Sequence, residues 1–421
     1  MSDVNFKDPF NALGKYLLDP VDYSEYYVQR KHSPVPILST RLKVDNKNSK
    51  LLFTGHRGSG KSTEIFRLIN GLDEYFVVYY SMETEFDITD IKYTDVLLSI
   101  GFQLHKVASN SGLEIDKEIT DKFAHWMEEI TETRIEEFTE GTSITAGFNA
   151  YVLKFLSKIQ SEDKTRREYR TKIESTTSDL IKLINTLIEK VNKELKTKLS
   201  KKGIVIIIDD LDKTDLEVAE EIFYKHSLSI TQPNCKIIYT VPISLAYSFN
   251  CNQMRQNFEK LIYLPMVKTK RKNGDEDKDG VSQLRDILSS RINLDLFEPD
   301  ALDILIMNTG GLIRDLLRCT ADCCLSALEQ DAEKISVPMV KETINGLKSD
   351  YQRFLTTEDY AKLESIQKYK TSDQDHLLMR LLHSLSVLYY QDDKSDEYWY
   401  DIHPTIYRLL EYRKLLSEFN E

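Results

Sequence analysis

The stretch Leu51-Leu52-Phe53-Thr54-Gly55-His56-Arg57-Gly58-Ser59-Gly60-Lys61-Ser62-Thr63 decides the fold of this chain. Its first residues form a short apolar run that is typical of a buried strand, and a helical pattern begins at Thr63. Between them the residues match Gly-x-x-x-x-Gly-Lys-Ser/Thr, the phosphate-binding P-loop, in the strand–loop–helix context that this motif requires. A glycine-rich turn without a ligand would not need the lysine and both flanking elements. The stretch therefore predicts a nucleotide-binding protein.

The P-loop motif assigns a role to each residue of the turn. Glycines leave room for backbone N–H groups to turn inward onto phosphate oxygens. Lys61 is expected to reach the β- and γ-phosphates and Ser62 to ligate Mg²⁺, while the positive end of the following helix faces the anion. The predicted nucleotide-binding residues are Gly55, His56, Arg57, Gly58, Ser59, Gly60, Lys61, Ser62 and Thr63.

A second motif follows another apolar run. Residues 203–213 read Gly-Ile-Val-Ile-Ile-Ile-Asp-Asp-Leu-Asp-Lys, a β-branched strand that ends in carboxylates. The run is continuous and does not alternate, which indicates a strand buried on both faces. This is the form of a Walker B element, in which we expect Asp209 to join the Mg²⁺ shell and Asp210 to polarise the attacking water. Because adjacent strand residues project in opposite directions, the two carboxylates are expected to have different tasks.

The composition is that of an ordinary globular protein. The chain has 421 residues, of which 29% are charged, and its net charge is −12. Dedicated nucleic-acid binders usually have a basic balance, although net charge does not report a local basic patch. Apolar runs such as Ile204–Ile208 are too short to span a bilayer, and the first residues lack the pattern of a signal peptide, so we expect a cytoplasmic protein. Cys319, Cys323 and Cys324 are expected to be buried small side chains rather than zinc ligands.

Strand and helix patterns divide the centre of the chain into a core, an insertion and a lid. Residues 46–267 hold the predicted P-loop core, and further strands are expected at 75–82, 236–242 and 260–265. From about 88 to 199 the pattern is helical, which predicts an inserted helical subdomain with a flexible joint near Gly141–Gly147. A charged loop ends the core, and residues 281–350 predict a helical lid. The fold class is therefore α/β, a P-loop NTPase parallel sheet sandwiched by helices.

The two ends of the chain are expected to have different tasks. Residues 1–45 are rich in Tyr and Pro, and we expect this N-terminal linker to cross the nucleotide base, with Tyr27 and Arg30 in the pocket. Surface packing is the alternative for both residues. Residues 351–421 combine two helical patterns with a hairpin pattern, which predicts a winged-helix-like module. The module has a charge of −4, which disfavours a DNA-reading wing and favours contact with a protein.

The order of these motifs resembles that of the AAA+ ATPases, and more closely the branch shared by origin-recognition and STAND switch ATPases. The similarity covers roughly residues 25–350 and is carried by the two nucleotide motifs and by Gly-Gly-x-x-Arg at 310–314. The Asp-Asp-Leu-Asp form of Walker B favours the STAND side, where a second Asp often replaces the Glu of AAA+ enzymes. The chain has neither an Asn-Lys-x-Asp nor a Leu-Ser-Gly-Gly-Gln motif, so ATP is favoured over GTP and an ABC ATPase is disfavoured.

The resemblance implies further site residues and cofactors. Thr240 lies at the position of sensor 1, and Arg314 at the position of the sensor 2 arginine of the lid. Arg255 takes the place of an arginine finger supplied to a neighbouring subunit, and Arg285 and Arg291 are its rivals. The implied cofactors are ATP and Mg²⁺. The expected catalytic residues are Asp210, Lys61, Thr240, Arg314 and Arg255.

The sequence leaves two functions open. In the first, suggested by the STAND resemblance, the chain is an ATP-binding and slowly hydrolysing switch that assembles with itself or signals to a protein partner. Bacterial anti-phage defence is a hypothetical setting for this switch. In the second, the chain is a DNA-associated AAA+ ATPase of the initiator or transposition-loader type. Salt-dependent DNA binding would favour the second function, and the acidic balance favours the first.

Overall fold

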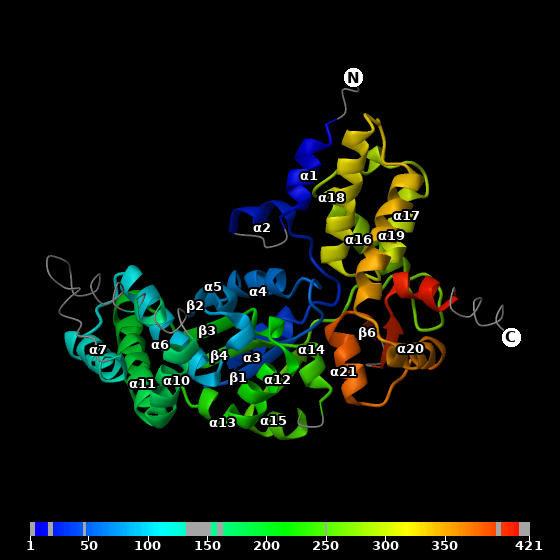
Figure 1. The fold of residues 1–421 in the computed structure, drawn as a ribbon. Helices are drawn as coiled ribbons and strands as arrows, with labels where there is room; N and C mark the ends of the chain where they lie inside the picture. Colours follow the sequence, from blue (N-terminus) through cyan, green and yellow to red (C-terminus); the bar gives the residue numbers. More distant parts are fainter. Residues whose placement is uncertain are drawn as a thin grey trace.

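The structure is a computed structural model that describes residues 5–15, 20–44, 48–131, 152, 154–157, 163–248, 251–392 and 397–411. Its centre is a parallel five-stranded sheet with the strand order β2-β3-β4-β1-β5 (Figure 1). The strands are β1 (Lys50–Thr54), β2 (Phe76–Ser81), β3 (Ile204–Asp209), β4 (Lys236–Val241) and β5 (Lys260–Tyr263). Because β4 lies between β1 and β3, the P-loop and the Walker B carboxylates leave the same edge of the sheet one strand apart.

Burial on both faces explains the continuous apolar runs of β1 and β3, in which every residue is buried. Alternate residues of each strand belong to two separate apolar clusters. Leu52 and Ile206 belong to the larger cluster, whereas Phe53 and Ile207 belong to the smaller one. Helices cover both clusters, so the predicted fold class, a P-loop parallel sheet sandwiched by helices, is confirmed.

The described part of the N-terminal segment forms three helices, which corrects the expectation of a linker. These are α1 (Lys7–Leu13), α2 (Pro20–Tyr26) and α3 (Val35–Val44). The helix α1 packs against α18 (Ile313–Glu329) of the lid, and α3 packs against α4 (Lys61–Ile69), which follows the P-loop. Buried apolar side chains such as Phe6 and Leu38 explain why this segment folds onto the core.

The insertion is helical in the part of it that the structure describes. Its helices are α6 (Tyr93–Asn110), α7 (Lys117–Thr131), α10 (Asp163–Ser175) and α11 (Thr177–Glu194), and it is flanked by short turns at η1 (Ile88–Asp90) and η2 (Leu195–Leu199). The apolar face of α11 is buried, and α11 packs on α6, which also contacts β2. Figure 1 shows these helices at the β2 end of the sheet. The joint expected near Gly141–Gly147 lies outside the described residues.

Short helical segments connect the remaining strands of the core. After β2 comes α5 (Met82–Glu85), and after β3 comes the turn η3 (Leu211–Lys213). Between η3 and β4 lie α12 (Leu216–Glu220), a π-helical turn η4 (Glu221–Lys225) and α13 (Ser227–Ile230). Between β4 and β5 lie α14 (Ile243–Ala246) and α15 (Cys251–Asn257).

The lid is helical, as expected. Its helices are α16 (Lys278–Ser289), α17 (Ala301–Asn308), α18 and α19 (Val337–Arg353), with a 3₁₀ turn η5 (Leu294–Leu296). Cys319, Cys323 and Cys324 of α18 are buried and free, in agreement with the prediction. Among the described residues, no helix is both long and apolar enough to cross a membrane.

The C-terminal region, called the C-terminal module below, contains two helices followed by an antiparallel hairpin, and a further helical segment at 404–411. The helices are α20 (Thr357–Tyr369) and α21 (His376–His383), and the hairpin pairs β6 (Val387–Gln391) with β7 (Tyr398–Ile402). Figure 1 shows this module beside the core and below the lid helices α16–α19. Tyr389 and Tyr400 of the hairpin pack their rings against Tyr247 of the core, at 5.4 and 5.8 Å between ring centroids. The hairpin is therefore part of an interface with the core.

Candidate functional site

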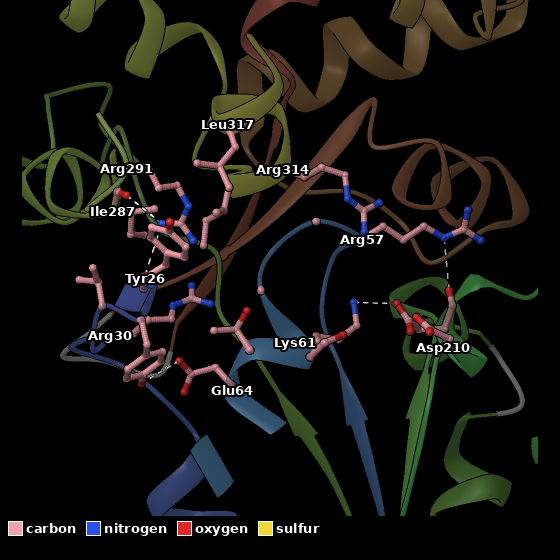
Figure 2. Close-up of a pocket in the computed structure, with 18 of the residues that line it drawn as sticks. Tyr26, Arg30, Arg57, Lys61, Glu64, Asp210, Ile287, Arg291, Arg314 and Leu317 are labelled. Atoms are coloured by element: carbon pink, nitrogen blue, oxygen red, sulfur yellow. Dashed lines mark hydrogen bonds and ion pairs between the residues drawn. The ribbon is translucent and has the colours of Figure 1, made fainter. Parts of the chain in front are cut away.

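A pocket lies at the carboxyl end of the sheet, where the N-terminal segment, the P-loop, η3 and the lid meet (Figure 2). Six basic side chains line the pocket, and three carboxylates oppose them. The basic residues are Arg30, Arg57, Lys61, Lys213, Arg291 and Arg314, and the acidic ones are Glu64, Asp210 and Asp212. The excess of positive charge suits a polyphosphate. Gly58, Gly60, Ser62 and Thr63 also line this pocket, as the P-loop motif predicts.

The P-loop turn needs its glycines for different reasons. Gly58 and Gly60 have φ angles of +78° and +94°, in the left-handed region that glycine adopts without strain. A Cβ on Gly55 would approach Cβ and the carbonyl oxygen of Leu264 at 3.1 Å, because β1 and the segment after β5 run close together here. Helix α4 begins at Lys61, so its unpaired N–H groups point into the pocket.

Lys61 is held by the chain itself. Its Nζ donates hydrogen bonds to the carbonyl oxygens of Gly55 and His56, both at 2.9 Å. The same nitrogen lies 2.7 Å from Oδ2 of Asp212, and both side chains are almost fully buried. Burial acts to raise the pKa of Asp212, but Lys61 beside it more than compensates, so the net pKa of this carboxyl is below its ordinary value.

Asp209 ends β3 next to Ser62. The Ser62 side chain is near enough to this carboxylate to act against the rise of its pKa. Tyr79 donates to Asp209 Oδ2 at 3.2 Å, and the backbone N–H of Asp210 donates to Oδ1 at 2.8 Å. Burial, together with the charges of Asp212 and Asp210, raises the pKa of Asp209 to about 6. The structure thus brings together the two residues predicted to bind Mg²⁺.

A group of three carboxylates fits a divalent cation. One oxygen from each of Asp209, Asp210 and Asp212 lies within 4.8 Å of the others, and all three residues are buried. With the Ser62 hydroxyl, the donors are all oxygen atoms, which is the ligand set that Mg²⁺ prefers. Burial of Asp209 and repulsion from Asp212 and Asp210 together raise its pKa, and a bound cation would offset both effects.

The backbone at Asp210 corrects the expectation that two strand neighbours point to opposite sides. The strand ends at Asp209, and Asp210 has a φ of +66°, in the left-handed region. This turn brings its carboxylate toward that of Asp209 instead of away from it. Asp210 is held there by the Ser81 hydroxyl and by Lys213, whose Nζ lies 2.9 Å from Oδ1. Asp tolerates this conformation better than most residues, but strain of this kind gathers at functional sites.

The lid reaches the P-loop through Arg314. The backbone N–H of Arg314 donates to the carbonyl oxygen of Gly58 at 3.1 Å. A Cβ on Gly58 would lie 2.7 Å from Cβ of Arg314, so only glycine allows this approach. Figure 2 shows the Arg314 side chain over the P-loop, near that of Arg57. Arg314 therefore lies at the pocket, next to the P-loop, and its role as a sensor 2 arginine stays a prediction.

A second wall of the pocket joins the N-terminal segment to α16. The Arg291 guanidinium lies over the ring of Tyr26 at 4.9 Å and donates to the Tyr26 carbonyl oxygen at 3.4 Å. Arg291, a rival for the trans-acting finger, therefore lies in the pocket of its own chain. The apolar side chains of Val28, Ile287 and Leu317 complete this wall, which offers a flat ring and apolar surface to a base.

Arg30 and Tyr27 also line the pocket, as expected. Arg30 is buried and donates to the carbonyl oxygen of Ser59 at 2.8 Å and to that of Pro265 at 2.5 Å. It therefore connects the P-loop to the segment that follows β5. Burial lowers the pKa of Arg30 to about 10. The Tyr27 hydroxyl donates to Glu64 at 3.3 Å, and the Tyr27 ring stacks on Tyr23.

Two P-loop residues contact the C-terminal module. Nε2 of His56 accepts a hydrogen bond of 2.7 Å from the backbone N–H of Tyr389. Arg57 donates to the carbonyl oxygens of Asp212 and Lys213, at 3.3 and 2.6 Å, and its Nη2 lies 3.2 Å from Nε2 of His383. The P-loop is therefore in contact with the core, the lid and the C-terminal module at once.

Three residues implied by the resemblance lie outside the pocket. Thr240 is fully buried within β4, and its hydroxyl donates to the carbonyl oxygen of Ile208 at 3.4 Å. Arg255 is exposed on α15 and donates to the Tyr263 hydroxyl at 3.4 Å. Arg285 forms an ion pair with Asp303 within the lid. The roles of Thr240 and Arg255 stay predictions, and the finger would act on a second chain.

Sequence reasoning missed several contributors to the site, four of which carry polar groups. Asp212 was visible as the last residue of Asp-Asp-Leu-Asp, yet no role followed from its position. Tyr26, Glu64 and Lys213 carry no motif signal, because their place in the pocket depends on how α2, α4 and η3 pack.

Comparisons with known proteins give one family match and several distant structural similarities. No curated protein matches the chain at a significant level. The Aeropyrum pernix ORC2 protein in its ADPNP–ADP complexes is 10% identical, with 96% of this chain and 98% of that chain covered and a TM-score of 0.43. Cdc6p from Pyrobaculum aerophilum is 11% identical, with coverage of 94% and 98% and a TM-score of 0.41. The Thermotoga maritima RuvB Holliday junction branch migration motor is 13% identical, with coverage of 94% and 95% and a TM-score of 0.38.

These structural similarities are too low to carry an argument about function. The family match rests on sequence and covers β1, β2, β3 and the first part of β4, including both nucleotide motifs. Residues 49–239 are similar to the KAP family P-loop domain, which agrees with the P-loop NTPase fold built from the residues above.

Proposed function

We propose that the chain is an ATP-binding and slowly hydrolysing switch, in which the nucleotide changes the contacts among the P-loop, the lid and the C-terminal module. The observation that carries this proposal is the position of His56, Arg57 and Gly58. These successive residues contact Tyr389, His383 and Arg314 respectively, so three consecutive P-loop residues meet two other parts of the chain. A phosphate that reorders the P-loop backbone would act on both interfaces.

The residues divide the expected chemistry among them. Lys61 and the N–H groups of the P-loop bind the β- and γ-phosphates, and Arg314 contacts the γ-phosphate from the lid. Ser62 and Asp209 hold Mg²⁺, which when bound neutralises charge on the phosphate oxygens. Asp210 orients the attacking water. The wall formed by Tyr26 and Arg291 takes the base, and Arg30 keeps the P-loop in place from outside the ligand.

Slow hydrolysis follows from the side chain at position 210. Asp is one methylene shorter than the Glu of fast enzymes, and here it is also tied to Ser81 and Lys213. Positioning supplies most of phosphoryl-transfer catalysis, and a displacement of about 1 Å can cost roughly 100-fold in rate. We therefore expect turnover below the ~1–100 s⁻¹ typical of kinases, unless a partner or a second copy of the chain supplies an arginine such as Arg255.

The domain division is part of the proposal. Residues 46–267 act as the ATPase core with its helical insertion, 281–350 as the lid, and 351–421 as a winged-helix-like output module for a protein partner. The DNA-associated alternative has less support, because Tyr389 and Tyr400 of the hairpin pack on the core and are not free to enter a groove.

The proposal is tested by nucleotide titration and by protection of the C-terminal module. Lys61→Ala is expected to weaken ATP and ADP binding at least about 100-fold, since it removes charge-assisted bonds to the phosphates. The control is Lys225→Ala, which removes an exposed lysine of the same core. In the wild-type chain, ATP and ADP are expected to give different rates of hydrogen exchange at 387–391. Equal affinities of Lys61→Ala and the wild type, or identical exchange with both nucleotides, would contradict the proposal.

The STAND resemblance also suggests a setting in bacterial defence against phage. The test is the plating efficiency of phages on bacteria that carry the wild-type chain or Lys61→Ala. Equal plating on both strains, over a broad phage panel, would remove defence from the proposal and leave the nucleotide switch unaffected.

A further inference from the structure

Lys61 has no donor left for a nucleotide. An ammonium group has three N–H donors. The Nζ of Lys61 faces three acceptors of its own chain: the carbonyl oxygens of Gly55 and His56 at 2.9 Å, and Oδ2 of Asp212 at 2.7 Å. A phosphate oxygen can reach this nitrogen only when one of the three acceptors gives way.

Asp212 is the acceptor that competes with phosphate most directly. The two carbonyl oxygens belong to the P-loop turn itself, whereas Asp212 comes from η3, a separate segment. Its carboxylate carries a charge of the same sign as the phosphate. The side chains of Lys61 and Asp212 are only 5% and 6% exposed, so water and salt screen their attraction little.

The turn that carries Asp212 is fixed from several sides. Arg57 donates to the carbonyl oxygens of Asp212 and Lys213, and Lys213 pairs with Asp210. Because Arg57 also lies beside His383, the position of η3 depends on the P-loop and on the C-terminal module. Asp212 is thus held against Lys61 and is not a freely rotating surface carboxylate.

We propose that Asp212 is a positioning residue that holds Lys61 in the pocket and competes with the β-phosphate for it. When a nucleotide binds, Lys61 exchanges its ion pair with Asp212 for one with the phosphate. The free energy of nucleotide binding is therefore reduced by the free energy of the Lys61–Asp212 pair. Asp212 lowers nucleotide affinity and favours release. The inference rests on the proposed function, since it names a control of the same phosphate site.

Any other role for Asp212 predicts that its loss does not strengthen nucleotide binding. Asp212 also belongs to the carboxylate group with Asp209 and Asp210. If it ligated Mg²⁺, its loss would weaken binding of Mg²⁺–ATP and leave ADP without Mg²⁺ unaffected. If it only stabilised the fold, its loss would weaken both. Tighter binding after the loss of a negative charge is expected from the competition alone.

The experiment is calorimetric titration of the full chain with ADP in the absence of Mg²⁺ and with ATP in its presence. Asp212→Asn keeps the shape and removes the charge, and we expect it to bind ADP about tenfold more tightly than the wild type, the value of one charge-assisted hydrogen bond. Asp212→Glu keeps the charge and is expected to remain close to the wild type. The control Glu217→Gln removes one exposed carboxylate from the following helix and is expected to have no effect.

The possible outcomes separate this inference from the proposed function. If the wild type binds no nucleotide, the proposed function fails. If it binds and Asp212→Asn binds no more tightly, only the competition is overturned, and weakening confined to the Mg²⁺ titration assigns Asp212 to the metal. Asp212→Ser is measured beside it, with folding followed by circular dichroism. Failure of both neutral variants to fold would also overturn the inference, because Asp212 would then be a structural residue.

Discussion

The ring of His56 accepts a hydrogen bond from the backbone N–H of Tyr389, with 2.7 Å between Nε2 and N, across 333 residues of sequence. His56 follows the first glycine of the P-loop, and Tyr389 lies in the middle of β6 in the C-terminal module. Only the unprotonated Nε2 can accept this bond. The contact between the C-terminal module and the P-loop therefore depends on the protonation state of His56.

This contact predicts a pH dependence of stability. Burial, with Lys61 nearby, lowers the pKa of His56 to about 3. Since an unfolded histidine has a pKa of about 6.5, between these values the unfolded chain binds a proton that the folded chain does not, so the free energy of unfolding falls as the pH drops below about 6.5. His56→Asn is expected to reduce this slope by up to about 1.4 kcal/mol per pH unit.

The measurement is urea unfolding at several pH values between about 7 and 5. The control His125→Asn replaces an exposed histidine and is expected to keep the wild-type slope. If His56→Asn has the same slope as the wild type, His56 is not held neutral in the folded chain.

The contact between Gly58 and Arg314 predicts that alanine at position 58 weakens ATP binding more than alanine at a matched glycine position. Gly58→Ala would place a Cβ 2.7 Å from Cβ of Arg314, whereas Gly112 has a similar φ of +74° and no atom within 4 Å of the added carbon. Both variants carry the strain of a left-handed alanine, about 1 kcal/mol, so their difference reports the lid contact. We expect Gly58→Ala to weaken ATP binding about tenfold or more beyond Gly112→Ala. Equal losses of affinity in the two titrations would mean that the lid does not seat on Gly58.

The position of Arg314 predicts a difference between nucleotides. Its side chain lies over the P-loop and away from the wall formed by Tyr26 and Arg291 (Figure 2), and the proposed function assigns it to the γ-phosphate. Arg314→Ala is expected to leave ADP affinity unchanged and to weaken ATP about tenfold, the value of a lost charge-assisted bond. Arg318→Ala, one turn further along α18, removes a half-exposed arginine outside the pocket and is the control. A similar loss for ADP and ATP would make Arg314 a structural residue of the lid.

The geometry of the Walker B turn predicts that substitutions of Asp209 and Asp210 have different effects. Asp209 belongs to the group of three buried carboxylates that fits a divalent cation, so Asp209→Asn is expected to weaken the Mg²⁺-dependent part of ATP binding. Asp210 is held by Ser81 and Lys213, so Asp210→Asn is expected to keep ATP bound and to slow single-turnover hydrolysis about 100-fold. Binding and hydrolysis are measured on both variants. Hydrolysis by Asp210→Asn at the wild-type rate would assign activation of the water to another residue.

The nucleotide motifs and the fold class were determined by local sequence. The P-loop could be predicted because its glycines, Lys61 and Ser62 lie within one turn, and only this order of residues lets the backbone surround a phosphate. The strands β1 and β3 could be predicted because burial on both faces requires uninterrupted apolar runs. Helices of the insertion and the lid followed from apolar periodicity, since the face that packs must repeat with the helical turn.

Only the tertiary structure decided how the site is completed. Asp210 turns back toward Asp209 because the chain leaves β3 through a left-handed residue, which no strand pattern encodes. The pairing of Lys61 with Asp212, the contacts of Arg30 and the wall of Tyr26 and Arg291 join residues up to 265 positions apart. The contact of His56 with Tyr389 depends on where the C-terminal module docks. Local sequence determines which side chains a segment carries. Contacts between residues this far apart depend on how whole helices and strands pack, so they form only in the folded chain.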